Sequence, residues 1–220
     1  MLYIVSTPIG NLEDITLRAL RILKEADCIA AEDTRHVQIL LNKYEIKTQT
    51  LSFHSYSGDM KLEKLIAMLK EGKNVALVSD AGTPGISDPA YSLIRRAIEE
   101  GVKISPIPGA SSLLAALVMS GQAMHQFLYL GFLPLKKGRQ TLLKSLADEE
   151  RTIVIFESQH RILRTLQDLL QYLGDREISV CSEITKIYEE ALRMKISEAL
   201  EHFKQKNPKG EFVLVISGKN

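Results

Sequence analysis

Short apolar runs alternate with helical segments through the first half of the chain, and this alternation limits the available folds more than any other feature. The runs LYIV, CIAA, TLSF and NVALVS have the composition of strands. Helical spacing occurs between and after them, over residues 15–24, 34–44, 62–70 and 90–99. The order predicts an α/β fold with a largely parallel sheet, in which ligands bind at the carboxyl ends of the strands.

A second alternation occupies the rest of the chain. The strand-like runs QFLYLGF, TIVIFE, EISVCSE and EFVLVISG accompany a helix with one apolar face over residues 160–174 and a shorter helix over 197–204. The composition changes around MSGQAMHQ, so we predict two α/β domains, 1–120 and 121–220, the first of which contains the AEDTR and SDAGTPGISDP loops. Before this boundary, SSLLAALVM is apolar all round, which predicts a buried helix.

Composition is that of an ordinary globular protein. With 45% hydrophobic and 25% charged residues, the 220-residue chain can bury a core, and disordered and fibrous classes are excluded. Its 28 basic and 27 acidic residues leave a net charge of +1, which neither supports nor excludes a nucleic-acid partner. The longest apolar run, Leu113 to Met119, is too short to span a membrane. We therefore expect a cytoplasmic protein without a membrane partner.

Two cysteines and several absent motifs narrow the chemistry. Cys28 and Cys181 each lie in an apolar run without other ligands at metal-binding spacing, so we expect buried side chains and no metal. The sequence has no G-x-G-x-x-G after its first strand, no P-loop, no G-x-S-x-G and no H-E-x-x-H. These absences favour a ligand that needs no pyrophosphate-binding loop.

Four strands of the first domain end in loops of unusual composition: VSTPIGN, IAAEDTRH, LVSDAGTPGISDP and PIPGASS. Because these strands are expected to be parallel, the loops should form one site from four sides. In the third loop, Gly82 and Gly85 allow conformations closed to other residues, and Asp80 follows the strand directly. We interpret these three as functional, and Asp88 as the cap of the next helix.

Charged and hydroxyl side chains in two of these loops allow two interpretations. Carboxylates at Glu32 and Asp33 beside Arg35 are typical of a general base held by its counter-ion, and equally of a structural ion pair that caps a helix. Serines at 111 and 112 are either helix caps or ligand contacts.

Several motifs in a fixed order resemble a known family. VSTPIGNLEDIT, ADCIAAEDTR, LVSDAGTPGISDP, PIPGAS, IFESQHR, SEITKIYEE and GEFVLVISG together are similar to the tetrapyrrole methylase superfamily of S-adenosylmethionine methyltransferases, in the branch that acts on ribosomal RNA. The resemblance implies two α/β domains with S-adenosylmethionine in the cleft between them, and a homodimer. It also implies 2′-O-methylation of a cytidine ribose in the decoding region of 16S rRNA, with the small ribosomal subunit as partner.

The resemblance can be carried onto single residues of this chain. The superfamily's Gly-Asp-Pro loop reads Ser-Asp-Ala here, so its detailed backbone contacts transfer less directly. The cofactor-binding positions that it implies are Pro8, Ile9, Gly10, Ser79, Asp80, Ala81, Thr83, Ile86, Ser111, Ser112, Phe156 and Glu157.

For the chemical step, the hypothesis is that Asp33, which matches the proton acceptor of tetrapyrrole relatives, accepts the proton of the ribose hydroxyl. Arg35 would orient it or hold a phosphate, and Glu32 is the rival base. Lys186 is a further candidate at the catalytic site. Phosphate contacts are expected from cations in the second domain, although a solvated linker would look similar; the candidates are Lys136, Lys137, Arg139 and Arg161.

Two other functions remain open at this point. A C-methyltransferase acting on a tetrapyrrole precursor would share the fold and the cofactor. A non-enzymatic RNA-binding protein would have lost the cofactor, which Asp80 and the intact glycines argue against.

Overall fold

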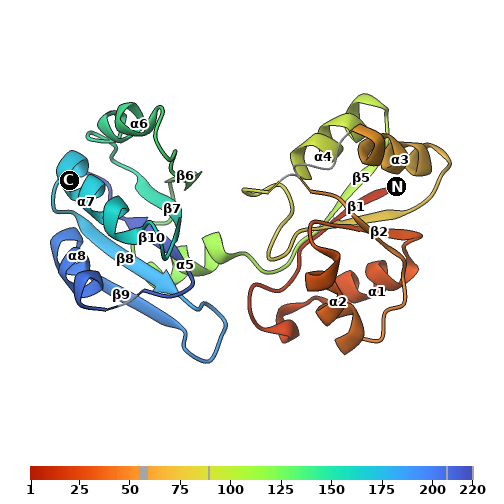
Figure 1. Cartoon of the computed structure of the whole chain (residues 1–220), viewed down its shortest axis with the longest axis horizontal. Coiled ribbons are helices and arrows are strands. Elements are labelled where there is room, and N and C mark those ends of the chain that lie inside the picture. The colour runs from red at the N-terminus through yellow and green to blue at the C-terminus, as the bar shows by residue number, and fades with distance from the viewer. Residues whose placement is uncertain (55–58, 89, 207, 220) are drawn as a thin grey trace. The chain divides into compact units, whose positions relative to one another are not determined.

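The computed structural model describes residues 1–54, 59–88, 90–206 and 208–219. It divides the chain into two compact units, Met1–Ser111 and Ser112–Asn220. Each unit has its own sheet and its own hydrophobic core (Figure 1).

The first unit is built on a parallel sheet with the strand order β3-β2-β4-β1-β5. Its strands are β1 (Leu2–Val5), β2 (Cys28–Ala31), β3 (Thr50–Ser52), β4 (Val75–Val78) and β5 (Ile104–Ile107). Its helices are the 3-10 turn η1 (Leu12–Asp14), α1 (Leu17–Glu25), α2 (Thr34–Lys43), α3 (Asp59–Lys70) and α4 (Ala90–Glu99). The predicted parallel α/β sheet is therefore confirmed.

Helices cover both faces of this sheet, with α1 and α2 on one side and α3 and α4 on the other (Figure 1). Val5 and Ile29 pack toward α1 and α2, whereas Leu2 and Ile4 pack toward α3 and α4. Burial on both faces explains why these strands are continuous apolar runs. Strand β5 lies at the sheet edge, where Pro106 is tolerated although it cannot donate a hydrogen bond.

The second unit contains a mixed sheet with the order β6-β7-β10-β8-β9, parallel between β6 and β7 and antiparallel elsewhere. Its strands are β6 (Phe127–Phe132), β7 (Thr152–Ser158), β8 (Glu177–Ser182), β9 (Glu190–Lys195) and β10 (Glu211–Ile216). Its helices are α5 (Ser112–Ser120), α6 (Arg139–Ser145), α7 (Ile162–Leu173) and α8 (Ile196–Gln205).

Helix α5 corrects two expectations. The helix was predicted to lie in the first domain, but it packs against β8, β9 and β10 and belongs to the second unit, so the division follows Ser111 and not residue 120. It covers one face of that sheet, while α6, α7 and α8 enclose a core on the other. Only one side of α5 reaches the strands, so Ala116 and Leu117 are buried whereas Leu114 and Val118 are exposed.

Two elements of the second unit were not predicted from the sequence. Strand β9 is an edge strand without a fully buried residue, and α6 is a short helix directly after the basic loop, so neither has a strong periodic signal. Both cysteines are buried, as predicted. Within the described ranges, no helix is long and apolar enough to cross a membrane, and no cluster of three metal-ligating side chains occurs.

Candidate functional site

The loops that follow β1 and β4 are joined at the carboxyl edge of the first sheet. The amide of Thr7 donates to the carbonyl of Gly82 at 2.9 Å, and the amide of Gly82 donates back to the carbonyl of Thr7 at 3.0 Å. The Thr7 hydroxyl also donates to the carbonyl of Ser79 at 3.2 Å. This two-way pairing fixes VSTPIGN against SDAGTPGISDP, as the parallel topology predicted.

Close approach of other backbone segments completes this side of the site. The hydroxyls of Ser6 and Thr83 lie 2.8 Å apart. A Cβ at Gly109 would lie 3.0 Å from the Cβ of Ser6, so the loop after β5 also packs tightly onto the loop after β1. Gly82 has a φ of +76°, a conformation that favours glycine, and its backbone faces Ile9. The expectation that Gly82 adopts a conformation closed to other residues is confirmed, and its functional role stays a prediction.

The side chains of Asp88, Asp80 and Asn11 at this edge each accept structural hydrogen bonds from backbone amides. The carboxylate of Asp88 accepts from the amides of Gly85 and Ala90, so it caps α4 as predicted. The Asp80 carboxylate accepts from the backbone amide of Asp33 at 3.0 Å, which ties the loop after β4 to the loop after β2. Asn11 caps η1 by accepting from the amide of Glu13 at 3.1 Å.

Asp33 is held tightly by Arg35. The Oδ1 atom accepts from the Arg35 amide at 2.8 Å and from Nε at 3.1 Å, and Oδ2 accepts from Nη2 at 2.7 Å. These bonds, those of the guanidinium first, hold the pKa of Asp33 well below its usual range. A carboxylate so stabilised in its charged form is a weak base, and Asp33 also serves as the N-cap of α2.

Glu32 has the opposite electrostatic environment. Burial raises the pKa of this carboxyl, and the nearby carboxylates of Asp80 and Asp88 raise it further. A raised pKa makes Glu32 a stronger base than an ordinary glutamate, while the neighbouring Asp33 is weakened. Of the two adjacent carboxylates, the electrostatic environment therefore makes Glu32 the stronger base.

Other expected cofactor positions of the first unit lie along the same loops. Pro8 is buried, Ile9 is half-buried, and Gly10 is exposed. In the loop after β4, Ser79 is buried, its hydroxyl donating to the carbonyl of Ala81 at 3.3 Å, and Ile86 is exposed. Ser111 and Ser112 stand at the division of the two units, where Ser112 begins α5.

The two expected cofactor contacts of the second unit differ in accessibility. Phe156 on β7 is half-buried and makes edge contacts with the rings of Tyr129 and Phe132, at centroid distances of 5.2 and 5.8 Å. Glu157 is fully buried. Its carboxylate accepts from the Thr165 hydroxyl at 2.5 Å and from the amide of Ser158 at 2.8 Å, so it is an interior group and not a surface for a cofactor.

The structure corrects the assignment of Arg139 to phosphate binding and gives Arg161, which is partly exposed, partners of its own. Arg139 is 3% exposed, and its guanidinium donates to Asp168 at 2.7 Å, to the Pro134 carbonyl at 3.2 Å and to the Thr165 hydroxyl at 2.8 Å. Arg161, at the start of α7, donates to the Leu133 carbonyl at 2.5 Å and pairs with Glu157. Their charges are already satisfied within the second unit.

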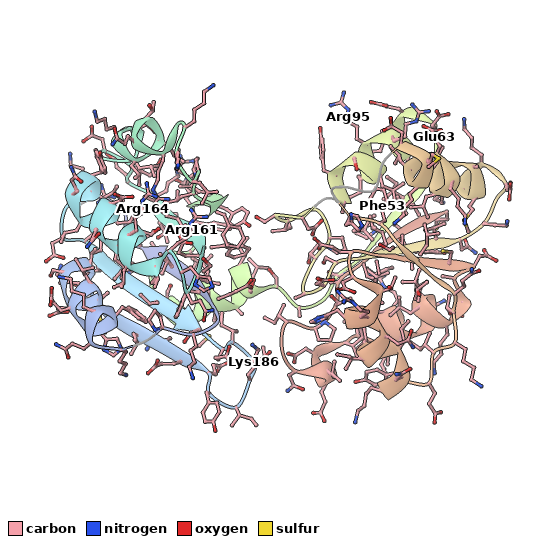
Figure 2. The ribbon with its side chains drawn as sticks, in the orientation of Figure 1. Phe53, Glu63, Arg95, Arg161, Arg164 and Lys186 are labelled. Carbon is pink, nitrogen blue, oxygen red and sulfur yellow. The ribbon has the colours of Figure 1, made fainter. Side chains whose placement is uncertain are left out.

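The remaining cationic candidates are accessible. Lys136 and Lys137 are exposed in the loop between β6 and α6. Lys186, labelled in Figure 2, lies in the β8–β9 connection and is also exposed. It pairs with Glu183 at 2.9 Å. Thr165 and Asp168, the partners of Arg139, were not predicted from the sequence. A signal was present, because Thr165 interrupts the apolar face of α7 at a position that is fully buried.

Comparison with known proteins bears on this geometry. The sequence model described as Tetrapyrrole (Corrin/Porphyrin) Methylases matches residues 1–200. A Thermotoga maritima protein named ribosomal RNA small subunit methyltransferase I is 51% identical over 218 residues, which cover 99% of this chain and 98% of that protein. The chain belongs to the tetrapyrrole methylase family, in its ribosomal RNA small subunit methyltransferase I group.

A further member of the group and two solved structures of lower sequence identity are also similar to this chain. The Bacillus subtilis protein of the same name is 45% identical over 221 residues, covering 100% of this chain and 76% of that protein. A crystal structure of diphthine synthase superposes with a TM-score of 0.79 at 17% identity, covering 100% of this chain and 90% of the other. Cobalt precorrin-4 methyltransferase gives a TM-score of 0.74 at 20% identity, with 98% and 94% covered. These two confirm the predicted fold class.

Proposed function

We propose that this protein uses S-adenosylmethionine to methylate the ribose 2′-oxygen of a cytidine in the decoding region of 16S rRNA. The single observation that carries the chemistry is the pair Glu32 and Asp33 at the edge of the first sheet, where one carboxylate is made more basic and its neighbour is neutralised by Arg35. The names of the relatives support the substrate class.

The loops of the first unit fit S-adenosylmethionine. When bound, this cofactor supplies a methyl group carried by a positively charged sulfonium. The strand-edge loops contain four carboxylates and one arginine, a charge balance that suits a cation. Tightly packed backbone at Ser6, Thr7 and Gly82 leaves main-chain groups and small side chains to contact an adenosine. The residues proposed to hold it are Pro8, Ile9, Gly10, Ser79, Asp80, Ala81, Thr83, Ile86, Ser111, Ser112 and Phe156.

Glu32 would accept the proton of the ribose hydroxyl as the oxygen becomes nucleophilic. A protonated hydroxyl is a poor nucleophile, and a carboxylate of raised pKa takes up its proton more readily than an ordinary one. The Asp33–Arg35 pair would hold Glu32 in position, because Asp33, the next residue, is fixed both by Arg35 and by Asp80. Most of the rate enhancement beyond that of proton transfer would come from orienting the hydroxyl toward the methyl group.

The RNA backbone needs positive partners, which the acidic loops of the first unit do not provide. We assign this task to the exposed Lys136 and Lys137 of the second unit, with Lys186 as a further contact near the target nucleotide. A homodimer is part of this proposal, because the resemblance to the family implies one. The small ribosomal subunit in the cytoplasm is the proposed partner.

A methylation assay tests this function. The purified protein is incubated with methyl-labelled S-adenosylmethionine and either assembled small subunits or free 16S rRNA from cells lacking the enzyme, and ribose methylation is mapped by mass spectrometry. We expect one cytidine to gain a 2′-O-methyl group. A porphyrin precursor offered in parallel should remain unlabelled. Methylation of that precursor alone, or calorimetry that shows no S-adenosylmethionine binding, would overturn the proposal.

A further inference from the structure

A chain of hydrogen-bonded polar groups, some buried and some partly exposed, runs beneath the basic loop of the second unit. We define this network by Arg139, Glu157, Arg161, Thr165 and Asp168. The Thr165 hydroxyl is its centre, because it donates to Glu157 at 2.5 Å and accepts from Arg139 at 2.8 Å. Arg139 also binds Asp168, and Arg161 binds Glu157 at 3.3 Å. Figure 2 shows Arg161 at the start of α7, on the same helix as the exposed Arg164.

Both arginines of the network also bind the loop that precedes α6. Arg161 donates to the carbonyl of Leu133 at 2.5 Å, and Arg139 donates to the carbonyl of the next residue, Pro134, at 3.2 Å. Arg139 is itself the first residue of α6, so the loop is fixed at both of its ends. Between these ends, the side chains of Lys136 and Lys137 are exposed.

A gain in stability is a weak explanation for ion pairs of this kind. Replacing buried ion pairs by apolar residues of similar volume is often neutral or stabilising, because removing two charges from water is costly. Directional bonds from two guanidinium groups do something that apolar packing does not: they fix the position and orientation of two consecutive carbonyl groups. A loop so fixed loses less conformational entropy when its lysines contact a ligand.

We propose that the network of Arg139, Glu157, Arg161, Thr165 and Asp168 positions the loop Leu133–Gly138 so that Lys136 and Lys137 contact phosphates of the substrate RNA. This inference rests on the proposed function, since it concerns how the same RNA is bound. The network members are positioning residues that act through the two lysines. They touch neither the cofactor nor the reacting atoms.

A double-mutant cycle in the full-length protein tests the coupling. Thr165→Val removes the central hydroxyl at nearly constant volume, and Lys136→Ala/Lys137→Ala removes the two cations. We expect Thr165→Val to raise the KM for small-subunit rRNA about fivefold, with kcat and S-adenosylmethionine affinity unchanged. In the lysine-free background it should raise KM no further, because the positioned groups are gone. Thr165→Ser, which keeps the hydroxyl, should restore the wild-type KM.

Salt dependence gives an independent readout. Loss of two phosphate contacts should reduce the slope of log affinity against log salt by about 1.4 on single-stranded RNA, since each contact contributes about 0.7. Lys43→Ala/Lys47→Ala removes the same charge from an exposed part of the first unit and should leave the slope unchanged. An equal KM increase by Thr165→Val with and without the lysines would overturn the inference, as would an unchanged slope in the lysine variant.

Two further arms keep the test decisive. If Thr165→Val does not fold, Asp168→Asn takes its place in the same cycle, because it weakens the anchor of Arg139 from a partly exposed position. If the wild-type protein methylates rRNA but the lysine variant has a normal KM and slope, the inference fails while the proposed function stands. If the wild-type protein methylates no rRNA, the proposed function itself fails.

Discussion

Replacement of Glu32 by glutamine tests which carboxylate accepts the proton. The change keeps the size of the side chain and removes its basicity. General base catalysis typically contributes a factor of about 10² to 10⁴, or ~2.7–5.4 kcal/mol of barrier, so kcat should fall by that factor. The structure predicts a much smaller effect for Asp33→Asn. Asparagine caps a helix as well as aspartate does, and the pKa of Asp33 is already lowered by Arg35.

The assay is methyl transfer to small-subunit rRNA under single-turnover conditions, with S-adenosylmethionine affinity measured separately by calorimetry. Asp33→Asn should retain kcat within about tenfold, the range of one weakened hydrogen-bonded contact. Glu25→Gln on α1 is the matched control, because it makes the same chemical change at an exposed ion pair with Arg21. Its kinetics should equal those of the wild type.

The pH profile provides the refutation. The base must be deprotonated, so the rate should rise with pH through the raised pKa of Glu32, above the ordinary glutamate value of 4.5. This acidic limb should disappear in Glu32→Gln. If Asp33 were the base, the limb would lie below the usual aspartate range and would survive in Glu32→Gln. A Glu32→Gln enzyme with near-normal kcat, together with an inactive Asp33→Asn enzyme that still binds S-adenosylmethionine, would refute the reasoning.

Three further predictions concern packing and stability. Gly82→Ala should lower the free energy of unfolding by about 1–2 kcal/mol, because its φ is left-handed, and should also weaken S-adenosylmethionine binding measured by calorimetry. Gly72 has a φ of +85° and open space around it, so Gly72→Ala should lower stability alone and leave that binding unchanged. Leu166→Ala, in the core of the second unit, should lower the free energy of unfolding by about 2–5 kcal/mol in urea titrations. Hydrogen bonds from Arg151 lower the pKa of Glu149 to about 2 from 4.5. The pair therefore stabilises the fold above pH 4.5, and this stabilisation is lost as the pH falls toward 2. Glu149→Gln should flatten the dependence of unfolding free energy on acid pH, and an unchanged dependence would contradict the assignment.

Sequence patterns predicted the fold where burial on both faces imposed a clear signal. Strands β1, β2 and β4 of the first unit are continuous apolar runs because helices cover both sides, and the alternation of strands with helices was enough to predict a parallel sheet. Strand β9 lies at a sheet edge and lacks such a signal. The domain boundary was misplaced because α5 looks like a continuation of the first unit, while the contacts that assign it to β8, β9 and β10 are long-range.

Prediction of the site was best where topology alone brings loops together. Parallel strands guarantee that the loops after β1, β2, β4 and β5 share an edge, and the pairing of Thr7 with Gly82 follows from it. Sequence spacing does not reveal the three bonds from Arg35 to Asp33, and these bonds are the reason that we now propose Glu32 and not Asp33 as the base. Arg139 was misjudged for the same reason, because a basic run was read as exposed although one member is buried against Asp168.

Charge is divided between the two units in a way that separates the two halves of the proposed reaction. The carboxylates at the edge of the first sheet favour a cation and repel phosphate, whereas the exposed Lys136 and Lys137 of the second unit favour phosphate. Because surface charges are screened within about 10 Å at 0.1 M salt, added salt should weaken the attraction of RNA to the second unit more than it affects the partly buried Glu32. Rising salt should therefore raise the KM for RNA steeply while kcat changes little, and an equal loss in both would argue against this division of charge.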